Sequence, residues 1–547
     1  MSKKAAKRKV TKKTTKKAAK KVAKKATKKT TRKVTKKATK KAARKTAKKA
    51  SASTSLTKPK KVLRGLPDIR RFFYANDTPI YFISATNFNL LGADEWIKGF
   101  KFICYIECFD GLHPNVFAPQ EEVPHDEFEG IEDINNYLLQ HKEVIDYIDS
   151  RKQKGVKSKA LFLMFDEQTE KLAKKLDLEV CFPSAAMRTS MDNKVETNRI
   201  AERAGVPCVP YVLKKVKDYK QLCRVSKHLG TDLVVQTPFG DSGHTTYFIT
   251  CEEDFAKHAE EIAAEKEVKV MKRINCHGSA IEACVTRHGT VVAPLMTELV
   301  GFKELTPYKG GWCGNEIYPD AFPKKLRKQA HDYTRLFGEQ LRKEGYKGYF
   351  ELDFLIDKDN GELYLGELNP RVTGASSITN HALYALSDMP LFLFHILEWM
   401  DHPYTLNTNV INRRWAHPEN CDSWGQLIIK HTEDTVRKVT KAPRSGIWRM
   451  DPDGGLEYDR MDTHRRAVET EHEAFFLRIS RVNDYFYEGA DIGILVMRGR
   501  LMTDEGDLSE RAKAWIEGIH GLYESTAVKA STKAAAKANE VAAFKLM

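Results

Sequence analysis

The sequence predicts an α/β fold, and three stretches carry that prediction. Residues 78–85 (TPIYFISA) and 159–166 (KALFLMFD) have the composition of buried strands, whereas residues 167–178 (EQTEKLAKKLDL) have the spacing of an amphipathic helix. Residues 348–369 alternate between polar and apolar side chains on both sides of a turn at Asp359-Asn360-Gly361, which predicts a β-hairpin. A chain of 547 residues has room for three or four such domains.

Charge is distributed very unevenly along the chain. The first 64 residues contain 29 of the 91 Lys and Arg residues and no acidic residue. The remaining 62 basic and 73 acidic residues give the rest of the chain a net charge of −11, although the whole chain carries +18. The sequence therefore predicts an acidic globular body joined to a cationic tail.

Residues 1–64 repeat with a period of four, with basic pairs from 12–13 in step to 48–49, separated by Ala, Thr and Val. Such a segment cannot bury a core and is expected to be disordered when free. Its spacing favours neutralisation of phosphates over recognition of bases. The pattern resembles the Lys/Ala tails of linker histones and bacterial histone-like proteins, which implies DNA or another polyanion as partner. A solubility tail, or one that binds anionic lipid or polyphosphate, is the alternative. Residues 526–547 repeat the composition faintly.

Asp192-Asn193-Lys194 begins a helical stretch that ends in Gly205-Val206-Pro207-Cys208-Val209-Pro210. Residues 233–249 (LVVQTPFGDSGHTTYFI) predict two strands around a glycine-containing turn. Backbone N–H groups of such a turn can bind phosphate oxygens. An ordinary surface lysine at 194 and a hairpin without a ligand at 233–249 are the alternatives. The polar or flexible residues of the turn are Gly240, Ser242, Gly243, His244 and Thr245.

The predicted hairpin at 348–369 carries the strongest chemical signal. If it pairs symmetrically about Asn360, Asp353 lies opposite Glu367, and Asn369 and Arg371 share the same face. Carboxylate and amide oxygens are hard ligands that suit Mg²⁺, and an arginine suits phosphate oxygens. A solvated polar face is the alternative. The sequence therefore predicts a site for Mg²⁺ bound to a polyphosphate.

These segments together resemble the ATP-grasp superfamily, most closely biotin carboxylase-like proteins. The resemblance covers most of residues 75–522, strongly at 188–210 and 348–371. It implies an ATP- and Mg²⁺-dependent (or Mn²⁺-dependent) ligase with metal ligands at Asp353, Glu367 and Asn369. ATP would be bound by Lys194, the 233–249 turn, the backbone from Lys272 to Ile274, and Glu282 toward the ribose or the substrate. Arg371 and Lys430, the latter on the predicted strand at 424–430, would act at the reaction centre.

Two departures from the family pattern separate this chain from biotin carboxylation itself. Gln236 stands where the family usually has a lysine. Ala375 stands where biotin carboxylase has a glutamate that acts as the base on bicarbonate. An amide can hydrogen-bond a phosphate but cannot neutralise it. The sequence also has no Met-Lys-Met motif for biotin attachment. The loop at 301–319 is predicted to contact the substrate, with an ordinary surface loop as the alternative.

The domain boundaries follow from the resemblance and from composition. They are a tail at 1–64, a small α/β domain at 65–187, an ATP-grasp domain at 188–405 with a lid at about 208–275, a biotin carboxylase-like C-terminal domain at 406–525, and a tail at 526–547. Ten scattered cysteines without CxxC pairs predict reduced thiols without zinc. The apolar run at 389–400 is long enough only for a buried helix, so we expect no membrane segment. Together with the thiols and the tail, this predicts a cytoplasmic, nucleoid-associated protein.

The predicted function is a ligase that joins a carboxylate to an amine or similar nucleophile through an acyl-phosphate, tethered to nucleic acid by its tail. A biotin carboxylase-type enzyme and a non-catalytic ATP-sensing nucleoid protein are the alternatives. The two substrates are not identified by the sequence, and the oligomeric state stays open, with a homodimer among the possibilities.

Overall fold

The computed structural model describes residues 60–120, 123, 128–240 and 245–528. Backbone contacts place residues from Lys61 onward in one compact unit, the body of the protein. Strand β1 (Leu63–Arg64) pairs in parallel with β17 (Tyr404–Thr405). These two residues, assigned to the tail from the sequence, therefore belong to the body. The predicted tails at 1–59 and 529–547 lie outside the described residues.

The N-terminal part of the body contains a five-stranded parallel sheet in the order β4-β3-β2-β5-β6. The two strands and the helix predicted from sequence are confirmed as β2, β5 and α5. Asp166 begins α5 with a capping box, because its side chain accepts from Thr169 N–H while Asp166 N–H donates to Thr169 Oγ1. The bounds are β2 (Ile80–Ser84), β3 (Phe100–Cys104), β4 (Val116–Phe117), β5 (Ser158–Phe162), β6 (Leu178–Val180), α2 (Gly65–Ala75), α3 (Ile131–Leu138), α4 (Lys142–Ser150), α5 (Glu167–Lys175) and α6 (Ala185–Met191).

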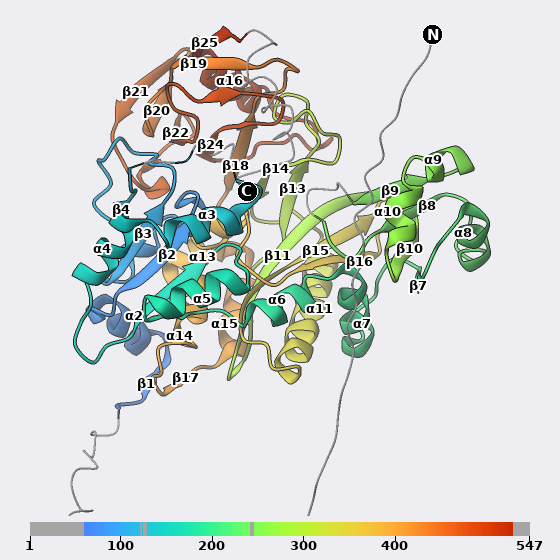
Figure 1. Cartoon of the computed structure of the whole chain (residues 1–547), viewed down its shortest axis with the longest axis horizontal. Helices are drawn as coiled ribbons and strands as arrows, with labels where there is room; N and C mark the ends of the chain where they lie inside the picture. The colour runs from blue at the N-terminus through green and yellow to red at the C-terminus, as the bar shows by residue number, and fades with distance from the viewer. Residues whose placement is uncertain (1–59, 121–122, 124–127, 241–244, 529–547) are drawn as a thin grey trace, which may run out of the picture. The chain divides into compact units, whose positions relative to one another are not determined.

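An eleven-stranded sheet forms the centre of the body, in the order β16-β15-β11-β13-β14-β18-β24-β22-β20-β21 with β12 branching from β11 (Figure 1). It runs without a break across the boundary predicted at residue 405, because β14 pairs with β18. The bounds are β11 (Cys276–Thr286), β12 (Gly289–Val292), β13 (Met296–Val300), β14 (Trp312–Ile317), β15 (Gly348–Asp357), β16 (Leu363–Asn369), β18 (Trp424–Lys430), β20 (Gly446–Met450), β21 (Leu456–Arg460), β22 (Glu473–Arg478) and β24 (Asp491–Arg498).

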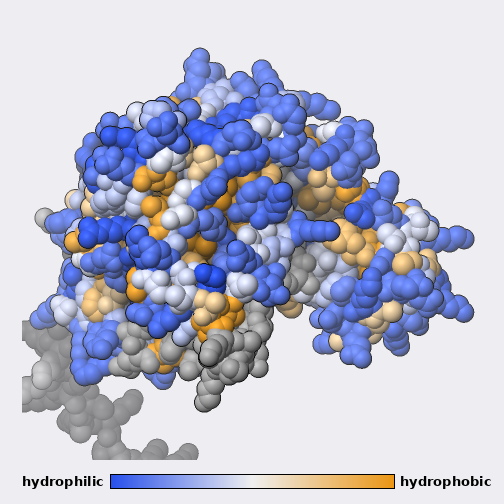
Figure 2. All heavy atoms as spheres, turned by 90° about the horizontal axis from the view of Figure 1, so that it is seen from above, coloured by the Kyte–Doolittle hydropathy of each residue, from blue (hydrophilic) through white to orange (hydrophobic). Residues whose placement is uncertain are grey.

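A smaller antiparallel sheet, which we call the lid, contains β7 (Tyr211–Lys214), β10 (Val268–Lys272), β8 (Leu233–Gln236) and β9 (Thr246–Ile249) in that order. Helices α8 (Tyr219–Val225), α9 (Glu252–Ala256) and α10 (Ala259–Ala264) belong to the same part of the chain. Seen from above, the surface is mostly hydrophilic, and hydrophobic residues show where the lid adjoins the rest of the body (Figure 2). Strands β8 and β9 match the two predicted within 233–249.

The remaining elements pack around the large sheet or form small additional sheets. The predicted helix at 192–204 is α7, which Asn193 caps by accepting from Val195 N–H and Glu196 N–H, and Gly205 ends it at φ +70°. The other bounds are α7 (Lys194–Ala204), α11 (Lys324–Lys343), α12 (Ser376–Thr379), α13 (Leu383–Ser387), α14 (Leu391–Leu397), α15 (Thr408–Trp415), α16 (Glu510–Gly521), β19 (Arg437–Lys441), β23 (Tyr485–Phe486) and β25 (Glu524–Ala527).

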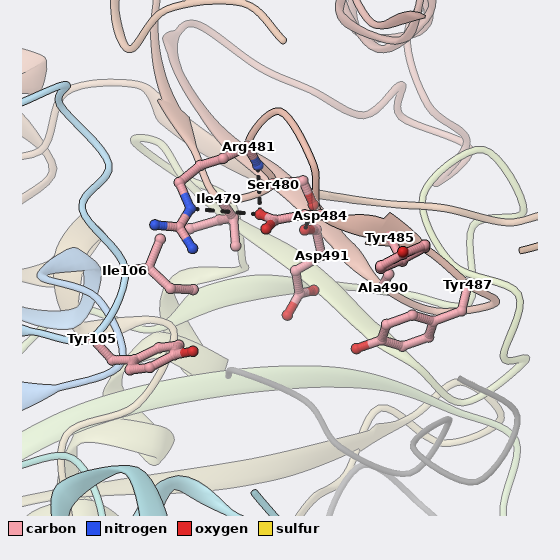
Figure 3. A pocket seen from close by; sticks show the side chains of 10 residues that line it. All are labelled: Tyr105, Ile106, Ile479, Ser480, Arg481, Asp484, Tyr485, Tyr487, Ala490 and Asp491. Atoms are coloured by element: carbon pink, nitrogen blue, oxygen red, sulfur yellow. Dashed lines mark hydrogen bonds and ion pairs between the residues drawn. The ribbon is translucent and has the colours of Figure 1, made fainter. Parts of the chain in front are cut away.

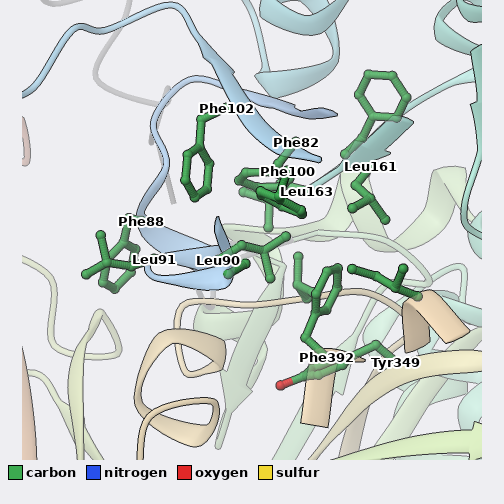
Figure 4. Packing of buried hydrophobic residues seen from close by; sticks show 14 of the residues in the cluster. Phe82, Phe88, Leu90, Leu91, Phe100, Phe102, Leu161, Leu163, Tyr349 and Phe392 are labelled. Atoms are coloured by element: carbon green, nitrogen blue, oxygen red, sulfur yellow. The ribbon is translucent and has the colours of Figure 1, made fainter. Parts of the chain in front are cut away.

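The two faces of the large sheet differ in character. Residues two apart on a strand share a face, so the register assigns Ile281, Leu352, Phe354 and Leu368 to one side, the rear face, where they form an apolar cluster. The opposite side, the front face, combines polar groups with apolar residues such as Tyr349 that pack against the N-terminal sheet (Figure 4). One shared core therefore joins the N-terminal sheet to the front of the large sheet.

Among the described residues, none of the helices has the length and apolarity required to traverse a bilayer. All ten cysteines are free thiols, and five of them are buried.

Candidate functional site

The predicted pairing of the hairpin is confirmed in β15 and β16. Asp353 lies opposite Glu367, and Glu351 lies opposite Asn369. Closer to the turn the pairing is shifted by one residue, because Gly366 is an additional residue between Glu367 and Leu365. Beyond this bulge the strands pair symmetrically about Asn360, which is the pairing that the prediction assumed. It places the carboxylates of Asp353 and Glu367 side by side on the front face.

The Asn369 amide is oriented by two carboxylates. Its Nδ2 donates to Glu351 Oε2 at 3.2 Å and to Asp353 Oδ2 at 3.1 Å. The amide nitrogen is therefore occupied, and its oxygen is the atom left to bind a cation. Glu351 is buried. The sequence analysis did not single it out from the core positions beside it.

Glu298 on β13 is an additional member of this acidic cluster that the sequence analysis missed. Gly278 leaves room for it, because a Cβ on Gly278 would lie 2.6 Å from Glu298 Oε2. Burial and the neighbouring Glu367 raise the pKa of Glu298 to about 7. Burial, Glu298 and Glu367 likewise raise the pKa of Asp353. Crowded carboxylates repel each other, and a bound cation relieves that repulsion.

The donor set fits a hard divalent cation shared with a ligand. Asp353, Glu367 and Asn369 offer carboxylate and amide oxygens, which Mg²⁺ and Mn²⁺ prefer. In the described part of the chain, no group of three or more His, Cys, Asp and Glu side chains is arranged to hold a metal by itself. Mg²⁺ commonly binds one or two carboxylates together with substrate phosphates, and this set matches that pattern.

Lys194 joins three of the predicted motifs. It is the first residue of α7 and is only 5% exposed. Its Nζ donates to Glu367 Oε1 at 2.5 Å on the hairpin and to the Gly240 carbonyl at 2.7 Å in the lid. A buried ammonium group thus lies between the acidic cluster and the start of the predicted phosphate-binding turn.

Lys269 on β10 is a second cation at the site that sequence reasoning missed. It pairs in register with Gln236, so both side chains lie on the inner face of the lid. Its Nζ donates to the carbonyl of the bulge residue Gly366 at 3.3 Å, and burial lowers the pKa of its ammonium group. The alternation in VKVMK was the available signal. Lys269 thus carries a positive charge directly across from Gln236.

Gln236 and the following turn form the lid side of the site. Gln236 Nε2 donates to Thr246 Oγ1 at 3.1 Å, while its Oε1 is buried with no hydrogen-bond partner. Gly240 has φ +143°, and a Cβ there would lie 2.1 Å from Thr245 Oγ1, so this position requires glycine. Ser242, Gly243 and His244 lie outside the described residues.

Arg371 supplies a third cation beside the acidic cluster. Its Nε is buried with no hydrogen-bond partner, which leaves a donor for a ligand oxygen. Its positive charge counteracts the rise in the pKa of both Asp353 and Glu351. Arg371 therefore lies close to the predicted metal ligands, as the sequence suggested.

The backbone from Lys272 to Ile274, which the resemblance assigns to the ATP site, connects the lid to the large sheet. We call this connection the hinge. Lys272 N–H donates to Pro210 and Arg273 N–H donates to Asp232, each at 3.0 Å, so Ile274 is the remaining backbone donor of the predicted set. An apolar cluster of Val234, Met271, Ile274, Leu355 and Tyr364 adjoins it, with Val209 and Tyr211. A flat apolar ring would fit against this cluster.

A cleft of about 1280 Å³ lies beside the acidic cluster, and Glu298 is the member of that cluster that lines it. Cys276, His277 and Gly278 line it just beyond the hinge, together with Leu355 of the apolar cluster. Glu298 lines the same cleft and also lies beside Asp353 and Glu367. The cleft thus adjoins both the apolar cluster, through Leu355, and the acidic cluster, through Glu298.

Glu282 has a different environment from the one expected. It is fully buried, and its two oxygens accept from Tyr349 OH at 2.6 Å, Ser376 Oγ at 2.5 Å and Thr373 Oγ1 at 3.2 Å. Both of its oxygens are thus hydrogen-bonded within the fold. Glu282 instead fixes the Gly/Ser-rich segment that follows Arg371.

Lys430 is also placed differently from the expectation. It is buried and forms an ion pair with Asp491, and the described residues give it no contact with the acidic cluster. It lies four residues beyond Gln426, or roughly 13 Å along the strand. Gln426 is the residue that reaches the Gly/Ser-rich segment, through Gly374 O at 2.7 Å. Asp491 lines a small pocket with Tyr105 and Tyr487 (Figure 3).

The predicted substrate loop at 301–319 is in part a strand of the central sheet. Residues 312–317 form β14, and the Trp312 ring packs where a Cβ on Gly374 would lie, 2.1 Å from it. Trp312 Nε1 donates to Asn315 Oδ1 at 3.2 Å. This segment supports the Gly/Ser-rich segment after Arg371, and its contact with a substrate stays a prediction.

Comparison with known proteins supports the fold. No protein-family model matches the chain. The chain is 24% identical over 213 residues to a D-alanine–D-alanine ligase of Clostridium novyi, covering 37% of this chain and 61% of that protein. It is 23% identical over 217 residues to one of Treponema denticola, covering 36% and 57%. The chain therefore spans about 60% of the length of the curated relatives it matches.

Two solved structures show the same architecture. The biotin carboxylase domain of a Hydrogenobacter thermophilus 2-oxoglutarate carboxylase, in complex with MgADP, ADP and bicarbonate, superposes with a TM-score of 0.54 at 12% identity over 83% of this chain and 92% of that chain. Campylobacter jejuni biotin carboxylase, in a β-γ-ATP complex, gives 0.51 at 13% identity over 82% and 92%. The chain therefore has an α/β ATP-grasp fold with the architecture of biotin carboxylase.

Proposed function

We propose that this protein is an ATP- and Mg²⁺-dependent ligase that activates a carboxylate as an acyl-phosphate and transfers the acyl group to an amine or similar nucleophile. The observation that carries the proposal is the convergence of Lys194, Lys269 and Arg371 on the acidic cluster of β15 and β16. Cations and metal-binding carboxylates that lie close together suit a metal-bound polyphosphate.

Each side chain has a distinct role in this proposal. Lys194 and Lys269 approach the phosphates from the body and from the lid, and Arg371 neutralises charge that develops on the transferred phosphoryl group. Asp353, Glu367 and Asn369 hold the metal, which screens the phosphate charge when it is bound. Ile274 and the apolar cluster orient the base. The lid excludes water, so that an acyl-phosphate reaches the nucleophile before hydrolysis.

The class of bond formed is inferred from the relatives. The curated relatives are D-alanine–D-alanine ligases, which supports carbon–nitrogen bond formation. A biotin carboxylase-type activity is the second candidate, because the solved Hydrogenobacter structure contains bicarbonate. Ala375 argues against it, since a buried methyl group stands where that family has a glutamate. Bicarbonate-dependent ATP cleavage would favour this candidate, whereas ATP binding without turnover would favour an ATP-sensing protein.

The cationic tail adds a second element to the proposal. Its 29 Lys and Arg residues without any acid suit DNA or another polyanion, which would place the enzyme at the nucleoid.

Substitution of the metal ligands tests the catalytic proposal. Asp353→Asn and Glu367→Gln should each lower ATP turnover by about 100-fold or more, because each removes a charge that holds the metal. The activity is measured as phosphate release by the full chain, screened against carboxylates and amines with Mg²⁺ present. Glu362→Gln, an exposed residue at the turn of the same hairpin, serves as the matched control. Unchanged turnover in both ligand variants would refute the assignment.

A further inference from the structure

A second cavity of about 380 Å³ lies against the rear face of the large sheet. Ile281, Val292, Leu295 and Trp415 form its apolar part. Ile281 belongs to the face opposite the acidic cluster, because it is adjacent in sequence to Glu282 on β11. The cavity adjoins the large cleft at Tyr318 and Ala321 but has its own walls, from α11 and α15. Its volume falls in the range of small-molecule sites, roughly 300–1000 Å³.

The charged residues that line this cavity are all basic. They are Lys324, Arg327, Lys328 and Arg413, together with His331, and no carboxylate is among the lining residues in the described chain. Arg327 and Lys328 pair with Asp320 and Asp332, which lie outside the lining. Lys324 and Arg413 have no carboxylate partner among the described residues. The cavity therefore carries a positive potential over an apolar floor.

Two buried polar atoms of lining residues have no hydrogen-bond partner. They are Arg327 Nε and His331 Nε2. Buried polar groups in proteins are almost always satisfied, and Arg327 Nε is a donor that lacks an acceptor. His331 Nδ1 lies 3.6 Å from Asp332 Oδ1, so Nε2 of the neutral ring is an acceptor that lacks a donor. Burial also lowers the pKa of His331, which is consistent with an enclosed position. The planar guanidinium groups of Arg327 and Arg413 match the geometry of a carboxylate.

We propose that this cavity binds a small carboxylic acid with an apolar aryl or branched alkyl body, separately from the nucleotide cleft. The carboxylate would contact Arg327 and Arg413, and the apolar body would lie against Ile281, Val292 and Trp415. A single negative charge fits better than a phosphate, because most of the enclosing surface behind the cations is apolar. The site does not depend on the ligase activity, since none of its residues belongs to the acidic cluster.

Calorimetric titration of the full chain with 4-phenylbutyrate tests the site. Binding is expected, and 4-phenylbutanamide and butyrate should each bind at least about tenfold more weakly, because one lacks the charge and the other lacks the body. The double substitution Arg327→Gln/Arg413→Gln should weaken 4-phenylbutyrate binding about tenfold or more. Ala416→Trp should abolish it, since Ala416 is an exposed lining residue whose enlargement blocks the cavity.

Two controls separate this inference from the ligase proposal. Lys343→Gln, in the last turn of α11 and outside the cavity, should leave binding unchanged. Glu367→Gln should also leave it unchanged while ATP turnover is lost. Equal binding of the acid and the amide, binding that survives Ala416→Trp, or no binding of 4-phenylbutyrate at millimolar concentration would each overturn the inference. Loss of binding in Glu367→Gln would indicate that 4-phenylbutyrate binds at the proposed nucleotide site, and would overturn the inference as well.

Discussion

Lys269 and Gln236 face each other across neighbouring lid strands, and together they bear on the departure of this chain from the ATP-grasp pattern that it resembles. The sequence placed an uncharged amide where a lysine was expected. The register shows that the adjacent strand carries the missing charge on the same face, with Nζ at 3.3 Å from Gly366 O. Cross-strand partners lie about 5 Å apart at Cβ, so either position can present an ammonium group to the same ligand.

Exchange of the two residues is therefore a direct test at the residue scale. Lys269→Gln should lower kcat for ATP turnover by about 100-fold, as expected for loss of one donor to developing charge. The double variant Gln236→Lys/Lys269→Gln should recover most of that loss, because it returns the charge to the same face. Lys272→Gln, at the exposed end of the same strand, should have little effect. Turnover is measured by phosphate release, and failure of the exchange to recover activity would contradict this account.

Ala375 leads to a different expectation. It is 2% exposed and precedes α12 within the core shared with the N-terminal sheet. The double variant Ala375→Glu/Gln236→Lys should not gain biotin-stimulated phosphate release in the presence of bicarbonate. A glutamate there would bury a carboxylate in a packed site, and reacting groups must be placed within a fraction of an ångström. Biotin-stimulated release by this variant would instead favour the carboxylase candidate.

At the scale of elements, local signals predicted what lies close in sequence. The hairpin of β15 and β16, helix α7 and the strands β8, β9 and β18 could be predicted from the sequence. Glu298 and Lys269 were missed because their roles depend on which strands are neighbours. The contacts of Glu282 and Lys430 were not visible for the same reason, since hydroxyl groups from 373–376 and the carboxylate of Asp491 reach them from distant parts of the chain.

Helix α14 gives a prediction for the stability of the body. His395 is fully buried among Phe182, Phe392 and Trp399. Its Nδ1 accepts from Tyr349 N–H at 3.0 Å and its Nε2 contacts the Cys181 carbonyl at 2.6 Å. This arrangement suits the neutral ring. Burial, with Lys347 nearby, lowers the pKa of His395 to about 3.

A histidine that stays neutral in the folded chain destabilises it as the pH falls. The unfolded chain binds a proton below a pKa of about 6.5 while the folded chain does not, so stability is lost from there down to about pH 3. His395 alone should lower the free energy of unfolding by about 2 kcal/mol between pH 7 and pH 5. Urea midpoints measured across this range should depend less on pH in His395→Asn, whereas the exposed His417→Asn should behave like the parent. Equal pH dependence in all three would refute this role.

At the scale of the whole molecule, the chain combines two parts of opposite charge. The body begins at Lys61 by its backbone contacts and, from Leu63, by the pairing of β1 with β17. The sequence before it carries nearly a third of all basic residues and no acid. The described residues of the proposed nucleotide site all belong to the body. Nucleotide binding and polyanion binding should therefore be separable.

A chain that begins at Lys61 should keep ATP binding and lose retention on DNA at moderate salt. The full chain should bind DNA with little sequence preference, because phosphate neutralisation carries no base information. Its affinity should fall linearly on a log–log plot against salt, by roughly 10³-fold or more between 50 and 200 mM if at least six phosphates are contacted. Filter binding of a random duplex and nucleotide titration of both chains provide the two measurements. Tight DNA binding by the shortened chain would contradict this division, because the net charge of its sequence is negative and only a dedicated surface could then hold the duplex.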